Sequence, residues 1–135
     1  MGIIITGTLR VFVSIPMSGR SPEEFEERLN KTQKYLLSTL KDIRFDYTEI
    51  QFVDTFTAEI PVQYKYSWIK TKQWLLGNAL NMMSSCDVVL FADDWYEARG
   101  CLVEKYVCDL YNIPHIIEGD NPDKVQLVFG KDSFQ

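Results

Sequence analysis

Short apolar runs rich in β-branched and aromatic residues alternate with helical patterns along the chain, and this alternation restricts the fold more than any other feature. The clearest run, Asp87 to Ala92, is apolar at every position after the first, which is typical of a strand buried on both faces of a parallel sheet. Further strands are predicted at Arg10 to Ile15, Thr48 to Val53 and Pro114 to Ile117, and Val125 to Phe129 is a candidate fifth strand.

The segments between these runs carry helix signals. Ser21 is a predicted N-cap, Pro22 occupies the first helical position, and Glu24 completes the pattern of a capping box. Two more helices are predicted over Ser67 to Ser84 and Gly100 to Asn112. The positions expected to face the core are Phe25, Leu29, Leu36 and Leu40 in the first helix, Trp68 and Trp74 in the second, and Val103, Val107 and Leu110 in the third.

The resulting order, β-α-β-α-β-α-β, predicts an α/β fold: a doubly wound, flavodoxin-like or Rossmann-like parallel sheet of four to five strands with helices on both faces. A chain of 135 residues has room for one such domain, so we expect residues 1–135 to form a single domain. In these sheets ligands bind beyond the carboxyl ends of the strands, where the strand order switches. A flavodoxin-like order places that switch between the first and third strands, where the loops Ser14 to Arg20 and Asp93 to Gly100 meet.

Charge and cysteine usage exclude several classes of partner. Nineteen acidic against fourteen basic residues give a formal net charge of -5, which disfavours binding to a nucleic-acid polymer. The three cysteines form no CxxC pair, and His115 is the single histidine, so we expect neither a disulfide framework nor a zinc site. Because the sequence has no long apolar span and no signal-peptide pattern, we expect an intracellular, cytoplasmic protein with no membrane partner.

Glu104 is the principal catalytic candidate. The run Gly100 to Glu104 predicts a carboxylate on the first turn of a helix, directly after the second site loop, and a helix N-terminus favours the ionised form. An ionised carboxylate in a partly closed cleft can attack an anomeric carbon, as in retaining glycosyl transfer. Acidic residues are also common in first helical turns for electrostatic reasons alone, so position by itself does not decide between the two interpretations.

The second site loop adds further carboxylates and two aromatic rings. Asp93 and Asp94 are candidate catalytic acids that would protonate a leaving base, and Glu97 is a candidate ligand of sugar hydroxyls. Trp95 and Tyr96 would stack on a base or form a wall of the pocket. The alternative is a solvated acidic loop whose aromatic rings pack against the edge of the sheet.

The first site loop offers Ser14, Ser18, Gly19 and Arg20 as substrate-binding residues. A glycine lets the backbone approach a ligand closely, neighbouring N–H groups can hold a phosphate, and an arginine can bind one with two hydrogen bonds. The alternative is an ordinary strand-to-helix turn, because neither GxxxxGK(S/T) nor GxGxxG is present. Cys101 at the following helix start is interpreted as a small packed residue, because no histidine base lies near it in the sequence.

These motifs together resemble the nucleoside 2-deoxyribosyltransferase-like superfamily, most closely a short branch found in bacteria and their phages and largely without assigned function. The family's opening strand and loop, Y-I-S-G-P-M-T-G, correspond to Phe12 to Gly19, and its C-D pair before an apolar strand corresponds to Cys86 and Asp87. Its G-W-x-x-S-x-G-A/C-x-x-E run corresponds to Asp94 to Glu104. The resemblance extends from Arg10 to Ile117.

The resemblance implies a Rossmann-like fold and a (deoxy)nucleoside or nucleotide as the small-molecule partner. Glu104 would be the nucleophile on C1′ of a deoxyribose. The base leaves, a glycosyl-enzyme forms, and a second base or water completes a transfer or a hydrolysis. The implied activity is that of a nucleoside 2-deoxyribosyltransferase or a deoxynucleotide N-glycosidase. The resemblance also implies a homodimer or higher homo-oligomer, and no metal or organic cofactor is expected.

Four positions depart from the family pattern. Phe12 replaces a tyrosine that hydrogen-bonds the nucleophile in transferases, Ile15 replaces a loop glycine, and Ala79 replaces an aspartate. Ala98 replaces a serine that contacts the 5′-phosphate in nucleotide-cleaving relatives. The nucleophile is therefore present without several of the groups that assist it.

Neighbouring residues offer substitutes for these groups. Asp93, Asp94 or Glu97 would take the place of the missing acid, and Arg99 would take the place of the missing phosphate contact. Gly100, the next residue, is a further candidate for substrate binding. Two interpretations from different classes follow. The first is an enzyme that acts through Glu104; the second is a nucleotide-binding module that keeps the pocket but has lost turnover. A structural protein with a solvated acidic loop is the third alternative.

Overall fold

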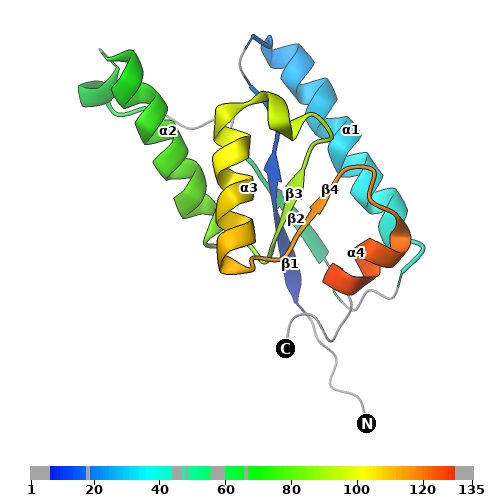
Figure 1. Ribbon diagram of the computed structural model, residues 1–135. Coiled ribbons are helices and arrows are strands. Elements are labelled where there is room, and N and C mark those ends of the chain that lie inside the picture. The colour runs from blue at the N-terminus through cyan, green and yellow to red at the C-terminus, as the bar shows by residue number, and fades with distance from the viewer. Residues whose placement is uncertain are drawn as a thin grey trace.

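Figure 1 shows the computed structural model, which describes residues 7–17, 19–43, 47, 49–55, 60–65 and 67–129. Its four parallel strands form one sheet in the order β2-β1-β3-β4. The strands are Thr8–Ser14 (β1), Glu49–Val53 (β2), Val88–Phe91 (β3) and His115–Ile117 (β4). The helices are Pro22–Leu40 (α1), Trp68–Met83 (α2), Arg99–Tyr111 (α3) and Pro122–Phe129 (α4), with short 3-10 turns at Val62–Tyr64 (η1) and Trp95–Glu97 (η2).

Helices cover both faces of the sheet, so the predicted doubly wound α/β fold is confirmed. The pair α1 and α4 lies on one face, and the pair α2 and α3 lies on the other (Figure 1). The flavodoxin-like strand order is confirmed as well, because β1 lies between β2 and β3. The switch in strand order therefore falls between β1 and β3. No helix within the described residues is long and apolar enough to cross a membrane.

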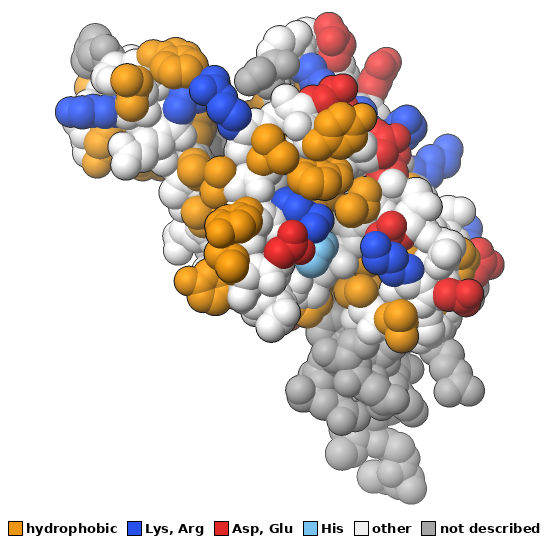
Figure 2. Space-filling view, viewed as in Figure 1, with side chains coloured by type: hydrophobic (Ala, Val, Ile, Leu, Met, Phe, Trp, Pro, Cys, Tyr) orange, Lys and Arg blue, Asp and Glu red, His pale blue; other side chains and the backbone are white. Residues whose placement is uncertain are grey.

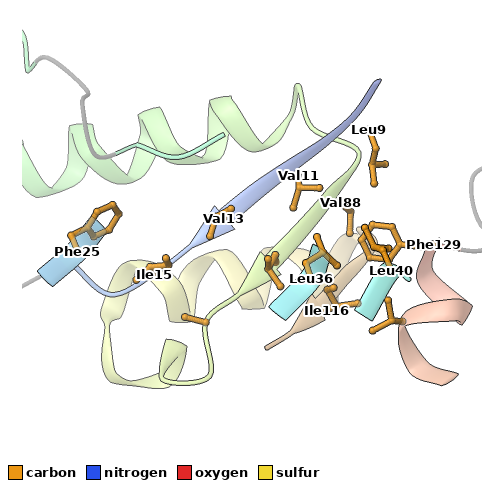
Figure 3. Close-up of a cluster of buried hydrophobic side chains, with 13 residues drawn as sticks. Leu9, Val11, Val13, Ile15, Phe25, Leu36, Leu40, Val88, Ile116 and Phe129 are labelled. Carbon is orange, nitrogen blue, oxygen red and sulfur yellow. The ribbon is translucent and has the colours of Figure 1, made fainter. Parts of the chain in front are cut away.

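The alternation of side chains along β1 divides the core between the two faces. Leu9, Val11 and Val13 pack with apolar side chains of α1 and α4 (Figure 3). Phe12, which lies between them in sequence, belongs to the cluster formed with α2 and α3. Since side chains two apart share a face, Ser14 lies on the α3 side of the sheet as well. The strand pattern alone thus directs a buried hydroxyl toward α3.

The start of α1 confirms its sequence signals. The Ser21 hydroxyl accepts a hydrogen bond of 3.2 Å from the backbone N–H of Glu24, and Pro22 is the first helical residue. Phe25 and Leu36 are among the residues that this helix buries against the sheet. A strong cap and an apolar stripe therefore fix where α1 leaves the first site loop.

The prediction of a fifth strand over Val125 to Phe129 is wrong, because this segment belongs to helix α4. The side chain of Asn121 accepts a hydrogen bond of 2.9 Å from the backbone N–H of Lys124, and Pro122 again occupies the first helical position. Val125 and Phe129, four residues apart, are buried on the same side of this helix. A short apolar run fits a strand and a buried helix equally well, so periodicity could not separate the two.

The face of α3 that meets the sheet also differs from the prediction. Its buried residues are Cys101, Glu104 and Cys108, at helical spacing, whereas Leu110 is 58% exposed. Val103 and Val107 are half-buried at the margin of this face. The prediction selected apolar residues only, and the true inner face of α3 includes a carboxylate.

Candidate active site

Two buried polar side chains join the carboxyl end of β1 to α3. Ser14 is the last residue of β1, and Glu104 lies on the buried side of α3. The Ser14 hydroxyl donates a hydrogen bond of 2.5 Å to Oε1 of Glu104. The candidate nucleophile therefore lies at the switch between β1 and β3, where ligands bind in doubly wound sheets.

Burial determines the protonation of Glu104. Desolvation raises the pKa of its carboxyl from an ordinary value of 4.5 to about 7, although the hydrogen bond from Ser14 acts in the opposite direction. We expected this residue on the first helical turn, held as an anion by the helix N-terminus. That expectation is wrong, because α3 begins at Arg99 and Glu104 lies on the second turn. Near neutral pH the side chain is divided between the acid and the carboxylate.

A cavity of about 440 Å³ opens beside Glu104. It lies between the carboxyl ends of β1 and β2, helix α2 and the first half of α3. Its walls are largely apolar, and Phe12, Leu75 and Leu76 contribute to them. A volume of this size and an apolar wall with a few polar groups are typical of sites for small molecules.

Two contributors to this cavity were not predicted. Helix α2 supplies one wall, and Trp68 at its start is 62% exposed rather than part of the core, because it lies at the cavity mouth. Asp54, directly after β2, lines the cavity; it and Glu104 are the two carboxylates that do so among the described residues. The switch-point rule selected only the loops that follow the first and third strands, so Asp54, which follows the second strand, was not selected.

The predicted catalytic acids lie in an ion-pair network beside the cavity. Arg28 of α1, whose side chain is 12% exposed, pairs with Asp93, with Asp94 at 3.4 Å and with Glu118 at 2.8 Å. Arg20 donates a hydrogen bond of 2.5 Å to Asp94, which ties the two site loops together. Neither aspartate lines the cavity. The network thus holds both loops in place and neutralises the carboxylates within it.

The remaining predicted site residues divide into those at the cavity and those away from it. Ser14, Arg99 and Gly100 line it, and Ser18 lies outside the described residues. Gly19, Arg20, Trp95 and Glu97 do not line it. Gly19 has a φ of 77°, so glycine is required there by the turn between β1 and α1.

Of the two aromatic side chains in the second site loop, Trp95 follows the packing alternative. The Trp95 ring packs against Phe91, with 5.9 Å between the ring centroids, and the Lys105 ammonium lies 5.5 Å from its centroid. Tyr96 is 60% exposed. Trp68, rather than either of these residues, is the aromatic side chain placed at the cavity mouth.

All four positions that depart from the family pattern line the cavity. They are Phe12, Ile15, Ala79 and Ala98. Each is apolar where the family pattern has a hydroxyl, a carboxyl or a glycine. The departures therefore concern the wall of the candidate site and not a distant surface.

The three cysteines are buried or half-buried, and the side-chain types that bind metal ions form no cluster within the described residues. Burial raises the pKa of the Cys101 thiol to about 12 and that of Cys108 to about 12, so both remain protonated packed residues. The three cysteines are free. Within the described residues, no group of three or more His, Cys, Asp or Glu side chains could share a metal ion.

No family model matches this chain, and neither the curated proteins nor the solved structures contain a match.

Proposed function

We propose that this protein cleaves or transfers at the N-glycosidic bond of a (deoxy)nucleoside or nucleotide, with Glu104 as the nucleophile. The observation that carries the proposal is a buried glutamate, hydrogen-bonded to Ser14, beside a largely apolar cavity at the carboxyl ends of β1 and β2. The cavity of about 440 Å³ suits a base joined to a sugar. The motif resemblance to nucleoside 2-deoxyribosyltransferase-like proteins supports the same substrate class.

The chemistry requires two displacements at one carbon. In the first, a carboxylate oxygen of Glu104 bonds to C1′, the C1′–N bond breaks, and its electron pair leaves with the base, which takes up a proton. In the second, a water oxygen or the nitrogen of an acceptor base attacks C1′. The ester bond then breaks, Glu104 leaves as a carboxylate, and the attacking group loses a proton.

We assign these proton transfers to Asp54. It lines the same cavity as Glu104 and follows β2 at the carboxyl edge of the sheet. Asp93 and Asp94 are the candidates that the sequence suggests, but they pair with Arg28 and Arg20, and neither lines the cavity. A carboxyl group that alternates between donating and accepting a proton is the usual partner of a carboxylate nucleophile in retaining glycosyl transfer.

A binding module without turnover is the second candidate function. The observation that favours it is the apolar character of Phe12, Ala79 and Ala98 in the cavity wall, where the family pattern has polar groups. Under this function the cavity holds a nucleotide, and Glu104 contributes only to affinity. The homo-oligomer and the cytoplasmic location remain predictions from the sequence.

Chromatography of free bases separates the two functions. The parent protein, Glu104→Gln and the control Glu27→Gln, which changes an exposed glutamate of α1, are incubated with deoxynucleosides and their 5′-monophosphates. We expect base release by the parent and the control, and none by Glu104→Gln. A new nucleoside that forms only when an acceptor base is added identifies a transferase.

Two results would count against the enzyme. Release at the parent rate by Glu104→Gln would exclude this residue as the nucleophile. No release from any substrate, together with a ligand-dependent rise in the melting temperature, would favour the binding module.

A further inference from the structure

The two halves of helix α2 have different surroundings. The residues that this helix buries, Ala79 and Met83, both lie in its C-terminal half, where they belong to one core cluster with Phe12 and Phe91 of the sheet. Of the described residues 68–78, none is buried. Figure 1 shows that α2 diverges from α3 toward its N-terminal end. The core therefore holds the C-terminal half of α2 in place, and it does not hold the N-terminal half.

The N-terminal half of α2 forms one wall of the cavity. Its apolar residues Trp68, Ile69, Leu75 and Leu76 all line that cavity. Ile69 is 70% exposed, and Trp68 is exposed to a similar degree. Figure 2 shows this end of the helix as a projecting lobe that carries hydrophobic and basic side chains. Large apolar side chains that are exposed at the mouth of a cavity would gain stability from burial.

The contacts of this half of α2 are local or weak. The Thr71 hydroxyl donates a hydrogen bond of 2.6 Å to the backbone carbonyl of Tyr64, which joins this half to η1. The Arg99 guanidinium, at the first residue of α3, lies 5.6 Å from the centroid of the Trp68 ring. A cation–π contact between exposed groups is weak, so it can form and break readily. Movement of this end toward the start of α3 would bring Trp68 over the cavity.

Gly77 lies at the junction of the two halves. It is exposed, and a Cβ at this position would meet no atom within 4 Å, so packing does not require a glycine here. Glycine is the least favourable residue in a helix after proline. A weak point of this kind, between a segment that is packed on the core and one that is not, is where a helix is expected to bend.

We propose that residues 68–76, the N-terminal half of α2, form a lid that closes over a ligand in the cavity, with Gly77 as its hinge. Closure over an empty cavity of about 440 Å³ would leave a void, whereas a ligand fills that space and allows Trp68 and Ile69 to be buried against it. Closure is therefore coupled to binding. It also separates Glu104 from bulk water. This motion does not depend on which bond the protein cleaves.

Distances between two spin labels measure the motion. One label is placed at Lys70→Cys in the lid and the other at Glu27→Cys on α1, because both residues are exposed and neither lines the cavity. The matched control moves the first label to Asn81→Cys, which is exposed, lies beyond Gly77 and is about three turns further along the same face of α2. Cys86→Ser removes the half-buried thiol, and the other two thiols are buried.

The ligand-free protein should give a broad distribution of distances from residue 70 and a narrow one from residue 81. Deoxynucleosides and their 5′-monophosphates are the probes, and a Glu104→Gln background prevents their turnover. A bound probe should narrow the distribution from residue 70 and shorten that distance by up to about 4 Å, because a bend of about 20° at Gly77 acts over about 10 Å of helix. The distance from residue 81 should not change.

Gly77→Ala tests the hinge. The structure has room for the added Cβ, and alanine favours the straight helix, so the melting temperature should rise while the lid moves less. The ligand-free distribution from residue 70 should therefore narrow, and the shift caused by a bound probe should decrease. A shift as large as in the protein with Gly77 would overturn the assignment of the hinge.

The lid itself would be overturned by an unchanged distance from residue 70 when calorimetry shows that a probe is bound. If no probe binds, equally narrow ligand-free distributions from residues 70 and 81 would overturn it. A broad distribution from residue 70 that Gly77→Ala narrows, without binding of any probe, would support the lid and count against the proposed substrate class. Base release by the parent, together with a residue 70 distance that never changes, would reject the lid and leave the proposed function intact.

Discussion

Ser14 and Glu104, ninety residues apart in the sequence, share a buried hydrogen bond of 2.5 Å between the end of β1 and the second turn of α3. Two opposing effects act on the carboxyl group at this point. Burial favours the neutral acid, and the donated hydrogen bond favours the anion. Burial is the larger effect, which leaves the pKa of Glu104 at about 7. Stability and activity should therefore both change with pH around neutrality.

The first prediction concerns stability. The pKa of Glu104 is about 7 in the folded protein and near 4.5 when unfolded, so the folded state binds more protons between these values. Stability from this group is then fully present below pH 4.5 and is lost as the pH rises through 7. Relative to the parent, Glu104→Gln should gain stability between pH 5 and pH 8.5, by up to roughly 3 kcal/mol. Urea unfolding of the parent and of Glu104→Gln at pH 5 and at pH 8.5 measures this difference in the free energy of unfolding.

The control for this comparison is Glu27→Gln, an exposed residue of α1. Its stability relative to the parent should be the same at both pH values. If the difference between Glu104→Gln and the parent is also unchanged from pH 5 to pH 8.5, the Glu104 carboxyl titrates as an ordinary exposed group.

The second prediction concerns the pH dependence of base release. The nucleophile must be ionised, so the rate of the parent should rise as the pH increases through the pKa of Glu104, about 7. Ser14→Ala removes the hydrogen bond that lowers this pKa, so the midpoint should move upward by about one pH unit or more. Ser38→Ala, an exposed change on α1, should keep the parent profile. A Ser14→Ala profile with an unchanged midpoint would contradict the role of this bond.

The third prediction tests the proton donor. Asp54→Asn keeps the size of the side chain but cannot exchange a proton, so base release should fall about 10²- to 10⁴-fold while ligand affinity changes much less. Asp123→Asn, on the exposed side of α4, is the matched control and should be fully active. A parent-like rate in Asp54→Asn, with a large loss of rate in Asp94→Asn, would mean that Asp94, in the loop after β3, is the proton donor.

The fold could be predicted because its signals are local and mutually consistent. Ser21 and Pro22 mark the start of α1, and the apolar run from Val88 marks a central strand. The alternation of these elements is sufficient to indicate a doubly wound sheet. The helix α4 was missed because Val125 to Phe129 is too short an apolar run to show its period, and its cap, Asn121, was the stronger signal.

The site was predicted less completely, because burial and pairing depend on tertiary contacts. Glu104 was found from its position after a site loop, but its burial shows only when α3 packs on β1. Asp94 was chosen by its loop, and the sequence does not show that Arg20 and Arg28 neutralise it. Asp54 has no distinctive neighbours in the sequence. It lines the cavity because β2, which it follows, pairs with β1 in the sheet.

The last prediction concerns the network that holds the site loops. Glu118 is buried and pairs with the half-buried Arg28, and it also accepts hydrogen bonds from the Thr32 hydroxyl and the backbone N–H of Asp93. Arg28→Met would leave the Glu118 carboxylate buried without its strongest partner, a change that typically costs about 3–5 kcal/mol. Lys31→Met is the control, since Lys31 is exposed and lies 4.0 Å from the same carboxylate; it should cost less than about 1 kcal/mol. Urea unfolding at pH 7 compares the two variants, and equal losses would mean that Glu118 is stabilised mainly by hydrogen bonds and not by Arg28.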